Sequence, residues 1–170
     1  DVTAEEYLEM IRLKTAVLLA ASLKIGARLG GASVEDADRL YDFGMHIGVA
    51  FQLKDDLLDV YGNAKVFGKN IGGDILCNKK TYMLIKALEH ANADQHNQLN
   101  SWINAETFQP AEKIAAVTEL YDRIGVKAVC ENKILEYSNR AMESLAAVSI
   151  AEEKKEELKK IIENLIHREV

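Results

Sequence analysis

The sequence predicts an all-α fold, and three observations favour it. The 170-residue chain has one proline, Pro110, where an average composition would give about eight. Apolar residues make up 48% of the chain and charged residues 28%, which is typical of long amphipathic helices. There is no alternating apolar–polar stretch long enough for a strand, no internal repeat and no low-complexity tract. We therefore expect residues 1–170 to belong to a single bundle of long antiparallel helices without an internal linker.

Two long helices are expected within the first 61 residues. The first begins at the capping box Thr3-Ala-Glu-Glu6, keeps apolar residues at helical spacing, and ends at Gly30-Gly31. The second begins at Ser33, which is placed to cap it, and keeps the helical period as far as Tyr61-Gly62. Each helix would have about 27 residues and a length on the order of 40 Å, which is usual for a large bundle.

Shorter helices are expected after an extended loop, Gly62 to Gly73. Apolar spacing predicts helices over residues 78–90, 95–104, 110–124 and 126–147, with Pro110 in the first turn of the third. A last helix would begin at a further capping box, Ser149-Ile-Ala-Glu152. We expect its Glu-Glu-Lys-Lys-Glu-Glu start to form a solvated face with ion pairs between residues four positions apart.

Charge and cysteine content exclude several classes of protein. With 21 Lys+Arg and 27 Asp+Glu the formal net charge is -6, which argues against a general binder of nucleic acid. Cys77 and Cys130 are too few for a disulfide framework, so the cytoplasm is the expected compartment. No apolar run approaches the roughly 18 residues of a membrane span. The chain begins at Asp1 rather than Met, and we expect it to have been cut or trimmed.

An acidic motif stands at the end of the second long helix. Gln52, Asp55 and Asp59 fall on one helical face, and Asp56 is adjacent to it. A solvated acidic stripe is the plainer interpretation, but no residue three or four positions away is Lys or Arg, so no local ion pair offsets the repulsion. The carboxylates also face the negative end of the helix dipole, which costs a few tenths to about 1 kcal/mol each when they are exposed. We therefore expect them to bind a cation, and carboxylate oxygens suit Mg²⁺.

A glycine-rich segment with lysines follows the motif. It contains Gly68-Lys69 and Gly72-Gly73-Asp74, then Lys79-Lys80, and it lacks the Lys-Ser or Lys-Thr of a Walker loop. Lysines near glycines are most often simply solvated. Beside the aspartates, however, acidic and basic groups together describe a site for a metal ion and a diphosphate.

These residues resemble a known family. Phe51-Gln52-x-x-Asp55-Asp56-x-x-Asp59 is similar to the second aspartate-rich motif of the trans-isoprenyl diphosphate synthases, the polyprenyl synthetases. The stretch from Gly68-Lys69 through Gly72-Gly73-Asp74 to Lys79 resembles the segment that follows this motif in the family. Lys14-Thr15 resembles the family's upstream Lys-Thr pair. The match is specific from Lys14 to about Tyr82, and the later helices agree in character only.

The resemblance implies a prenyltransferase. An allylic diphosphate would ionise with the help of Mg²⁺, and C4 of isopentenyl diphosphate would attack the resulting carbocation. Asp55 would bind Mg²⁺ directly, with Asp56 and Asp59 in or near the same coordination shell. The metal would stabilise the charge of the departing diphosphate.

The resemblance also implies which residues contact the substrate. Lys14 and Lys69 would hold the allylic diphosphate and take part in catalysis, and Lys79 would join them in binding it. Thr15 and Gln52 would line the pocket.

One part of the family pattern is absent from this chain. The first aspartate-rich motif and the arginine pair that follows it have no match. The chain therefore looks like the C-terminal part of one isoprenoid-synthase helical domain, whose missing N-terminal half would hold the isopentenyl diphosphate site. Helices 3–29 and 34–61 would then lose cover on their inner faces, and we expect a homodimer or larger assembly.

Two alternatives stay open. A class I terpene cyclase would share the helices and the acidic motif, but its typical Asn-Asp/Ser/Glu metal triad has no match, and Lys14 and Lys69 favour a synthase. A non-catalytic helical subunit of a synthase would have no reason to keep uncompensated charge at a helix end.

Overall fold

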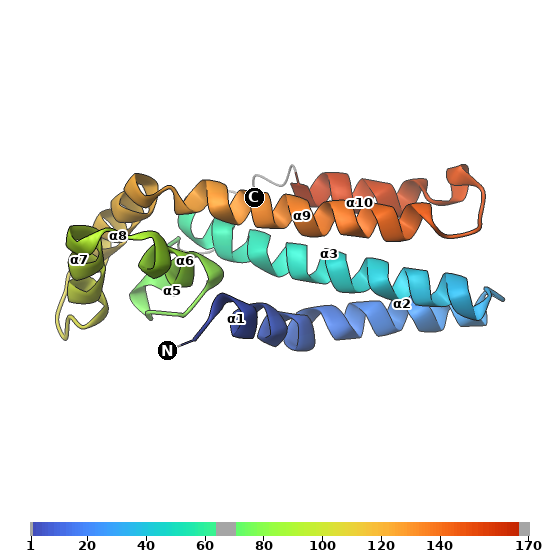
Figure 1. Ribbon diagram of the computed structural model, residues 1–170, viewed down its shortest axis with the longest axis horizontal. Coiled ribbons are helices and arrows are strands. Elements are labelled where there is room, and N and C mark those ends of the chain that lie inside the picture. The colour runs from blue at the N-terminus through green and yellow to red at the C-terminus, as the bar shows by residue number, and fades with distance from the viewer. Residues whose placement is uncertain (1, 64–70, 167–170) are drawn as a thin grey trace. The chain divides into compact units, whose positions relative to one another are not determined.

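The computed structural model describes residues 2–63 and 71–166, which divide into two compact units (Figure 1). The long-helix unit comprises residues 8–54 and 132–166, and the short-helix unit comprises residues 2–7, 55–63 and 71–131. All regular structure in these ranges is helical, which confirms the predicted all-α fold. None of the helices in the described ranges combines the length and the apolar character that a bilayer crossing requires.

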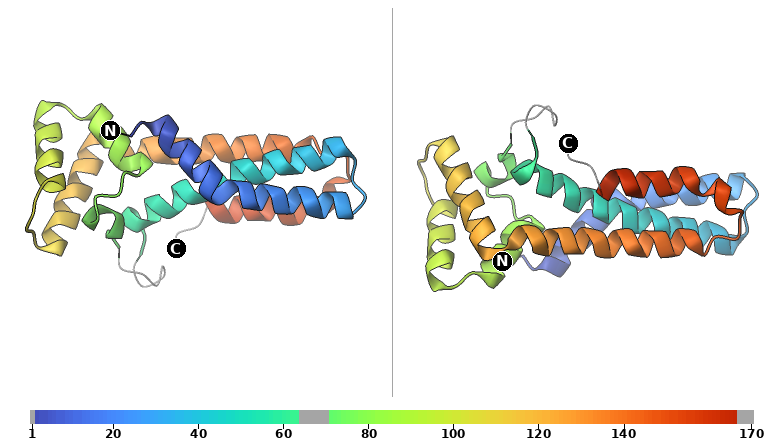
Figure 2. Two further views of the ribbon diagram at one scale, coloured as in Figure 1. Left: turned by 90° about the horizontal axis from the view of Figure 1, so that it is seen from below. Right: turned by 90° about the horizontal axis from the view of Figure 1, so that it is seen from above.

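Long helices run side by side in the long-helix unit (Figure 1, Figure 2). They are α2 (Val17–Leu29), α3 (Val34–Tyr61) as far as Lys54, α9 (Val126–Ala146) from Asn132, and α10 (Glu156–Ile166). Short connections join α2 to α3 and α9 to α10, so each pair is antiparallel, as in a helix bundle. The core of the unit consists of buried apolar side chains, among them Ala20, Phe43, Ile47, Leu53, Ile134, Leu145 and Ile162.

The first long helix is interrupted, although the sequence predicted one helix over residues 3–29. It consists of α1 (Ala4–Ile11), a π-helical turn η1 (Arg12–Ala16), and α2. Ile11 and Ala16 are both buried although they are five positions apart, whereas an α-helix returns to the same face after three or four. The wide π turn absorbs the extra residue and keeps both side chains in the core, and Lys14 is exposed on this turn.

Two glycines let the first helix approach α3 closely. A Cβ atom added at Gly44 would lie 2.6 Å from Cα of Ala20, and one added at Gly48 would lie 2.6 Å from Cα of Ala16. Since a side chain cannot come this near to backbone, α3 has glycine wherever it crosses the buried alanines. This contact determines the depth at which η1 and α2 pack on α3.

The short-helix unit contains α5 (Gly73–Leu76), α6 (Tyr82–His90), α7 (Ala93–Ile103) and α8 (Pro110–Ile124). The predicted helix over 110–124 is confirmed, with Pro110 in its first turn. The prediction of a helix from residue 78 is wrong, because Asn78 has a left-handed φ of 52° and Thr81 caps α6 by accepting the N–H of Leu84. α7 begins before residue 95, because Asn92 forms a capping box with Gln95.

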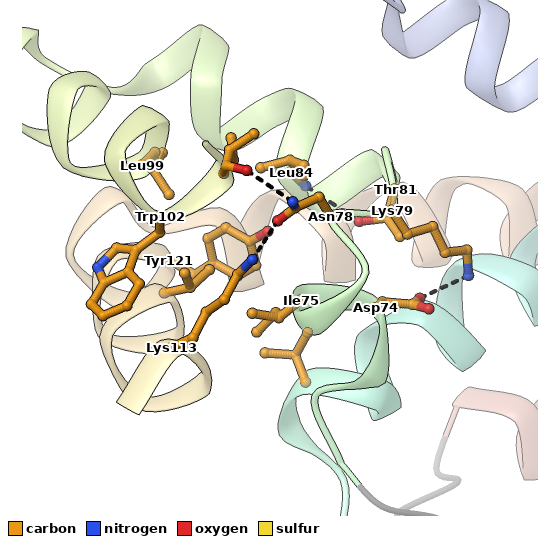
Figure 3. Close-up of a pocket in the computed structure, with 13 residues that line it drawn as sticks. Asp74, Ile75, Asn78, Lys79, Thr81, Leu84, Leu99, Trp102, Lys113 and Tyr121 are labelled. Carbon is orange, nitrogen blue, oxygen red and sulfur yellow. Dashed lines mark hydrogen bonds and ion pairs between the residues drawn. The ribbon is translucent and has the colours of Figure 1, made fainter. Parts of the chain in front are cut away.

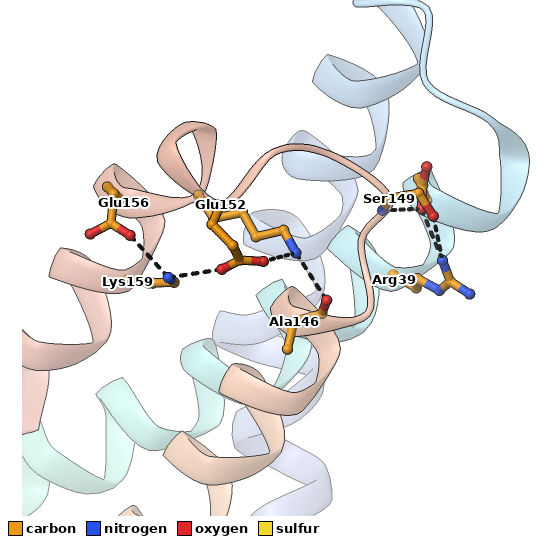
Figure 4. Close-up of polar contacts among 8 residues, drawn as sticks. Arg39, Ala146, Ser149, Glu152, Glu156 and Lys159 are labelled. Carbon is orange, nitrogen blue, oxygen red and sulfur yellow. Dashed lines mark hydrogen bonds and ion pairs between the residues drawn. The ribbon is translucent and has the colours of Figure 1, made fainter.

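The connection between α9 and α10 also differs from the prediction (Figure 4). Ser149 does not cap a helix. Its N–H donates to Asp36 at 2.9 Å and its hydroxyl accepts from Arg39 at 3.3 Å. A single 3₁₀ turn (Glu152–Lys154) precedes α10.

The charged segment at the start of α10 is solvated only in part. Lys159 forms an ion pair with Glu156, three positions away and not the four expected, and Lys155 is 2% exposed. Its ammonium donates to the carbonyl of Ala146 at 2.9 Å and to Glu152 at 2.7 Å (Figure 4). Lys155 therefore caps the C-terminal end of α9, where a positive charge is favoured.

Candidate active site

The acidic motif lies where predicted, at the end of α3, and its three aspartates differ in exposure. Asp55 and Asp59 are partly exposed, whereas Asp56 is 2% exposed. All three belong to the short-helix unit. A buried carboxylate needs partners, and the neighbours of Asp56 supply them.

Asp56 is held from two sides. The hydroxyl of Tyr7, at the start of α1, donates to Oδ2, and the ammonium of Lys79 donates to Oδ1 at 3.0 Å. Burial raises the pKa of Asp56, while the Tyr7 hydrogen bond and the charge of Lys79 act in the opposite direction. Burial also raises the pKa of Tyr7, and the adjacent carboxylate raises it further, so the phenol keeps its proton.

Lys79 joins the motif to the segment that follows it. Its ammonium also donates to Asp74 at 2.7 Å (Figure 3). Lys79 therefore bridges two carboxylates, Asp56 and Asp74. Partial burial alone would lower the pKa of Lys79, but the hydrogen bonds and charges of Asp74 and Asp56 outweigh it and raise the pKa. Lys79 therefore stays a cation at any physiological pH.

Asp59 fixes the other end of that segment. Its carbonyl accepts the N–H of Gly72 at 2.6 Å, and its carboxylate accepts the N–H of Asp74 at 2.8 Å. Burial raises the pKa of Asp59, and the Asp74 N–H opposes the shift. Asp56, Asp59, Asp74 and Lys79 thus form one connected group, which we call the acidic cluster.

Three of the remaining predicted residues, Lys14, Thr15 and Gln52, belong to the long-helix unit. Thr15 donates to Gln52 at 3.1 Å within the long-helix unit, so these two predicted pocket residues lie together. Lys14 is exposed beside them on η1. Lys69 lies outside the described residues.

The described residues do not complete a metal site by themselves. Among them, no three Asp, Glu, His or Cys side chains are placed to hold one ion together. A cation that keeps several waters, such as Mg²⁺, needs only one or two protein carboxylates when substrate phosphates complete its shell. Asp55 and Asp59 are the partly exposed carboxylates that fit this description.

Tyr7 was not predicted from the sequence as part of the site. A buried tyrosine normally finds a partner for its hydroxyl, and this is the signal that the sequence offered. The partner itself is 49 residues away, so spacing within the helix could not identify it.

Known proteins of one family resemble this chain. The model of the polyprenyl synthetase family matches residues 1–121. A short chain isoprenyl diphosphate synthase of Methanothermobacter thermautotrophicus is 37% identical over 169 residues, which cover 99% of this chain and 51% of that protein.

Solved structures match along the whole chain. A crystal structure of a geranylgeranyl pyrophosphate synthase has a TM-score of 0.91 and 35% identity, covering 100% of this chain and 53% of that one. A geranylgeranyl pyrophosphate synthase from Corynebacterium glutamicum, complexed with isoprenyl diphosphate and magnesium, has a TM-score of 0.88 and 30% identity, covering 99% and 48%.

This chain spans about half the length of the relatives that it matches. The family match begins upstream of Lys14 and extends beyond Lys79, so it includes every residue of the predicted site. The chain belongs to the polyprenyl synthetase family.

Proposed function

We propose that this chain is the C-terminal portion of a prenyltransferase that condenses isopentenyl diphosphate with an allylic diphosphate. In this reaction the bond between C1 of the allylic group and its diphosphate oxygen breaks, and the electron pair leaves on the diphosphate. C4 of isopentenyl diphosphate then forms a bond to C1, and a proton is lost from the product cation. The relatives are isoprenyl diphosphate and geranylgeranyl pyrophosphate synthases, which supports this substrate class.

The observation that carries the proposal is the acidic cluster, whose Asp59 is partly exposed, together with the partly exposed Asp55 of the same motif. A departing diphosphate needs positive charge close to its oxygens. Lys79 supplies one such charge, held in place by Asp56 and Asp74. Lys14 and Lys69 would supply the others, as the family resemblance implies, and Thr15 and Gln52 would line the pocket.

Asp55 and Asp59 would hold Mg²⁺, which when bound neutralises charge on the diphosphate oxygens. The Corynebacterium glutamicum relative, complexed with magnesium and isoprenyl diphosphate, supports this choice of ion. We assign Asp56 a different part in the same site. Both of its oxygens already accept hydrogen bonds, from Tyr7 and Lys79, so it contributes mainly by orienting Lys79.

The rest of the enzyme would come from a segment of similar length that this chain lacks. That segment would carry the first aspartate-rich motif and the isopentenyl diphosphate site. We further propose a homodimer, for which the exposed apolar side chains of α2 are the support. The low cysteine content, Cys77 and Cys130 in 170 residues, supports the cytoplasm as its compartment.

The alternatives receive less support. The matching family model is that of the polyprenyl synthetases, which favours a synthase over a terpene cyclase. A non-catalytic subunit would not need Lys79 held between two carboxylates in the same unit as the partly exposed Asp55 and Asp59.

The experiment compares the chain with and without the missing half. With Mg²⁺, isopentenyl diphosphate and geranyl diphosphate, the 170-residue chain alone should form no product, because positioning of two substrates is worth on the order of 7–11 kcal/mol. Addition of the upstream half of a relative should restore condensation. Product formation by the chain alone would contradict the requirement for the first acidic motif.

A substitution tests the metal assignment in the completed enzyme. Asp55→Ala should lower kcat by about a hundredfold or more, since it removes a ligand worth several kcal/mol of charge stabilisation. Asp38→Ala is the matched control, because Asp38 is an exposed carboxylate of the same helix that pairs with Lys24. A kcat for Asp55→Ala within about threefold of the Asp38→Ala value would refute the assignment.

A further inference from the structure

We propose that Asn78 and Lys113 are positioning residues that orient Lys79 for the diphosphate. Neither belongs to the acidic cluster, and neither was given a role from the sequence, although Asn78 lies within the stretch from Gly68 to Lys79. The proposal rests on the function proposed above, because it assigns Lys79 a diphosphate ligand. All the residues that it uses lie in the short-helix unit.

Asn78 immediately precedes Lys79 and joins the turn before α6 to α7 and α8 (Figure 3). Its side-chain amide donates to the carbonyl of Ile103 at the end of α7, at 2.9 Å. Its side-chain carbonyl accepts from the ammonium of Lys113 on α8, at 2.7 Å. Its backbone is left-handed, a conformation that glycine would adopt at lower cost. The two side-chain hydrogen bonds are therefore the reason to have asparagine at this position.

Lys113 is an unusual residue for a purely structural contact. It is 1% exposed, and its ammonium lies 4.2 Å from the centroid of the Phe108 ring. Within the described ranges it has no carboxylate partner, and burial lowers its pKa. A buried cation costs free energy that an apolar side chain of similar length would avoid. What Lys113 supplies and an apolar residue would not is the hydrogen bond to Asn78.

Lys113 does not face a ligand site of its own. The cavity beside it, lined by Asn78, Trp102 and Tyr121 among others, has a volume of about 20 Å³ (Figure 3). That is room for a single water and excludes a phosphate or a metabolite. The hydrogen bond from Lys113 to Asn78 therefore acts on Lys79, the residue that follows Asn78.

Lys79 is constrained at both its backbone and its side chain. Its N–H donates to the carbonyl of Asp74 at 2.9 Å, and its carbonyl accepts the N–H of Thr81 at 2.8 Å. Its ammonium then reaches Asp56 and Asp74. Once Lys113 holds Asn78, the turn before α6 has little freedom, and Lys79 points into the acidic cluster.

The neighbour of Lys113 on α8 constrains the other end of the same segment. Ile114 packs on Gly72, where an added Cβ atom would lie 2.6 Å from Cγ1 of Ile114, and Gly72 itself has a φ of +86°. Gly72 donates to Asp59. Lys113 and Ile114, which are adjacent on α8, therefore contact the segment at Asn78 and at Gly72, on either side of Asp74.

The test measures binding of inorganic pyrophosphate with Mg²⁺ to the 170-residue chain by calorimetry. Lys113→Met and Asn78→Gly should each weaken binding about tenfold, the value of one charge-assisted hydrogen bond. The double variant should bind pyrophosphate no more weakly than either single variant. In a Lys79→Ala background, neither change should alter the binding. Lys127→Met is the control, because that exposed lysine also lies over an aromatic ring, 4.9 Å from the centroid of Tyr61, but does not contact Asn78.

Hydrogen exchange at the Lys79 amide gives a readout that needs no ligand. Its protection should fall in Lys113→Met and stay unchanged in Lys127→Met. If Lys113→Met fails to fold, Asn78→Gly serves in both measurements, since glycine accepts the left-handed backbone.

Three results decide the matter. If Lys113→Met weakens binding as much in the Lys79→Ala background as in the wild-type chain, the proposal is overturned, because Lys113 would then act by another route. Unchanged protection of the Lys79 amide in Lys113→Met would also overturn it. If the wild-type chain binds no pyrophosphate, the proposed function fails at this site, and hydrogen exchange alone then decides whether Lys113 positions Lys79.

Discussion

Replacement of Tyr7 by Phe removes one hydroxyl from the buried side of the acidic cluster. In the structure that hydroxyl donates to Asp56, a carboxylate that is 2% exposed and has Lys79 as its other described hydrogen-bond donor. A hydrogen bond to a charged group contributes about 1.5–3 kcal/mol, and loss of the donor leaves the buried carboxylate less well solvated. We therefore expect Tyr7→Phe to lower the free energy of unfolding by about 2 kcal/mol at pH 7.

The structure provides a matched control for this change. Tyr61 also donates its hydroxyl to an aspartate, Asp122, at 2.7 Å, but that aspartate is exposed and water can replace the donor. Tyr61→Phe should therefore cost less than about 1 kcal/mol. Urea unfolding followed by circular dichroism would measure both variants, and the linear extrapolation is adequate for differences.

The pH dependence of the loss has a definite sign. Burial already raises the pKa of Asp56 in the folded state, so the protonated form stabilises the fold below the unfolded pKa and this contribution is lost as pH rises through the folded pKa. Without the Tyr7 hydroxyl the folded pKa rises further. The destabilisation should thus be largest at neutral pH and shrink as the pH falls toward the ordinary value for aspartate. A cost for Tyr7→Phe no greater than for Tyr61→Phe, or one that grows in acid, would refute this reasoning.

Two further predictions concern packing and assembly. Gly48→Ala should destabilise by about 1–3 kcal/mol because its Cβ would meet backbone at Ala16, whereas Gly26→Ala, with open space around it, should stabilise by about 0.5–1 kcal/mol in the same thermal unfolding assay. Leu18, Ile25 and Leu29 are 76%, 60% and 85% exposed on α2, so light scattering should show a dimer or larger species at micromolar concentration; a clean monomer would contradict the expectation that these side chains need cover.

Local signals in the sequence predicted helices well and predicted contacts between helices poorly. The bounds of α8 follow from Pro110 at its start and a glycine, Gly125, just past its end, and both signals act within one turn. The wrong start at residue 78 has a related origin, because the polar residues 78–81 carry no clear stop signal, whereas Asn78 has a left-handed backbone and Thr81 caps α6. Ser149 carries a helix-start signal too, but Asp36, far away in the sequence, uses its N–H instead.

The same difference between local signals and long-range contacts applies to the candidate site. The position of the acidic motif at the end of α3 could be predicted because charge, spacing and helix end all belong to one segment. The partners of Asp56 could not, since Tyr7 and Lys79 reach it from 49 and 23 residues away. Metal binding by Asp55 and Asp59, and diphosphate binding by Lys14 and Lys69, stay predictions.

Each compact unit has a buried lysine whose acetylation would report that the unit has opened. Lys113 lies in the short-helix unit and Lys155 in the long-helix unit, at 1% and 2% exposure, whereas amine-modifying reagents attack only accessible lysines. Acetylation of either lysine therefore requires its own unit to open. Mass spectrometry of a briefly acetylated sample, peptide by peptide, would show whether the two units open together or one before the other as urea is added.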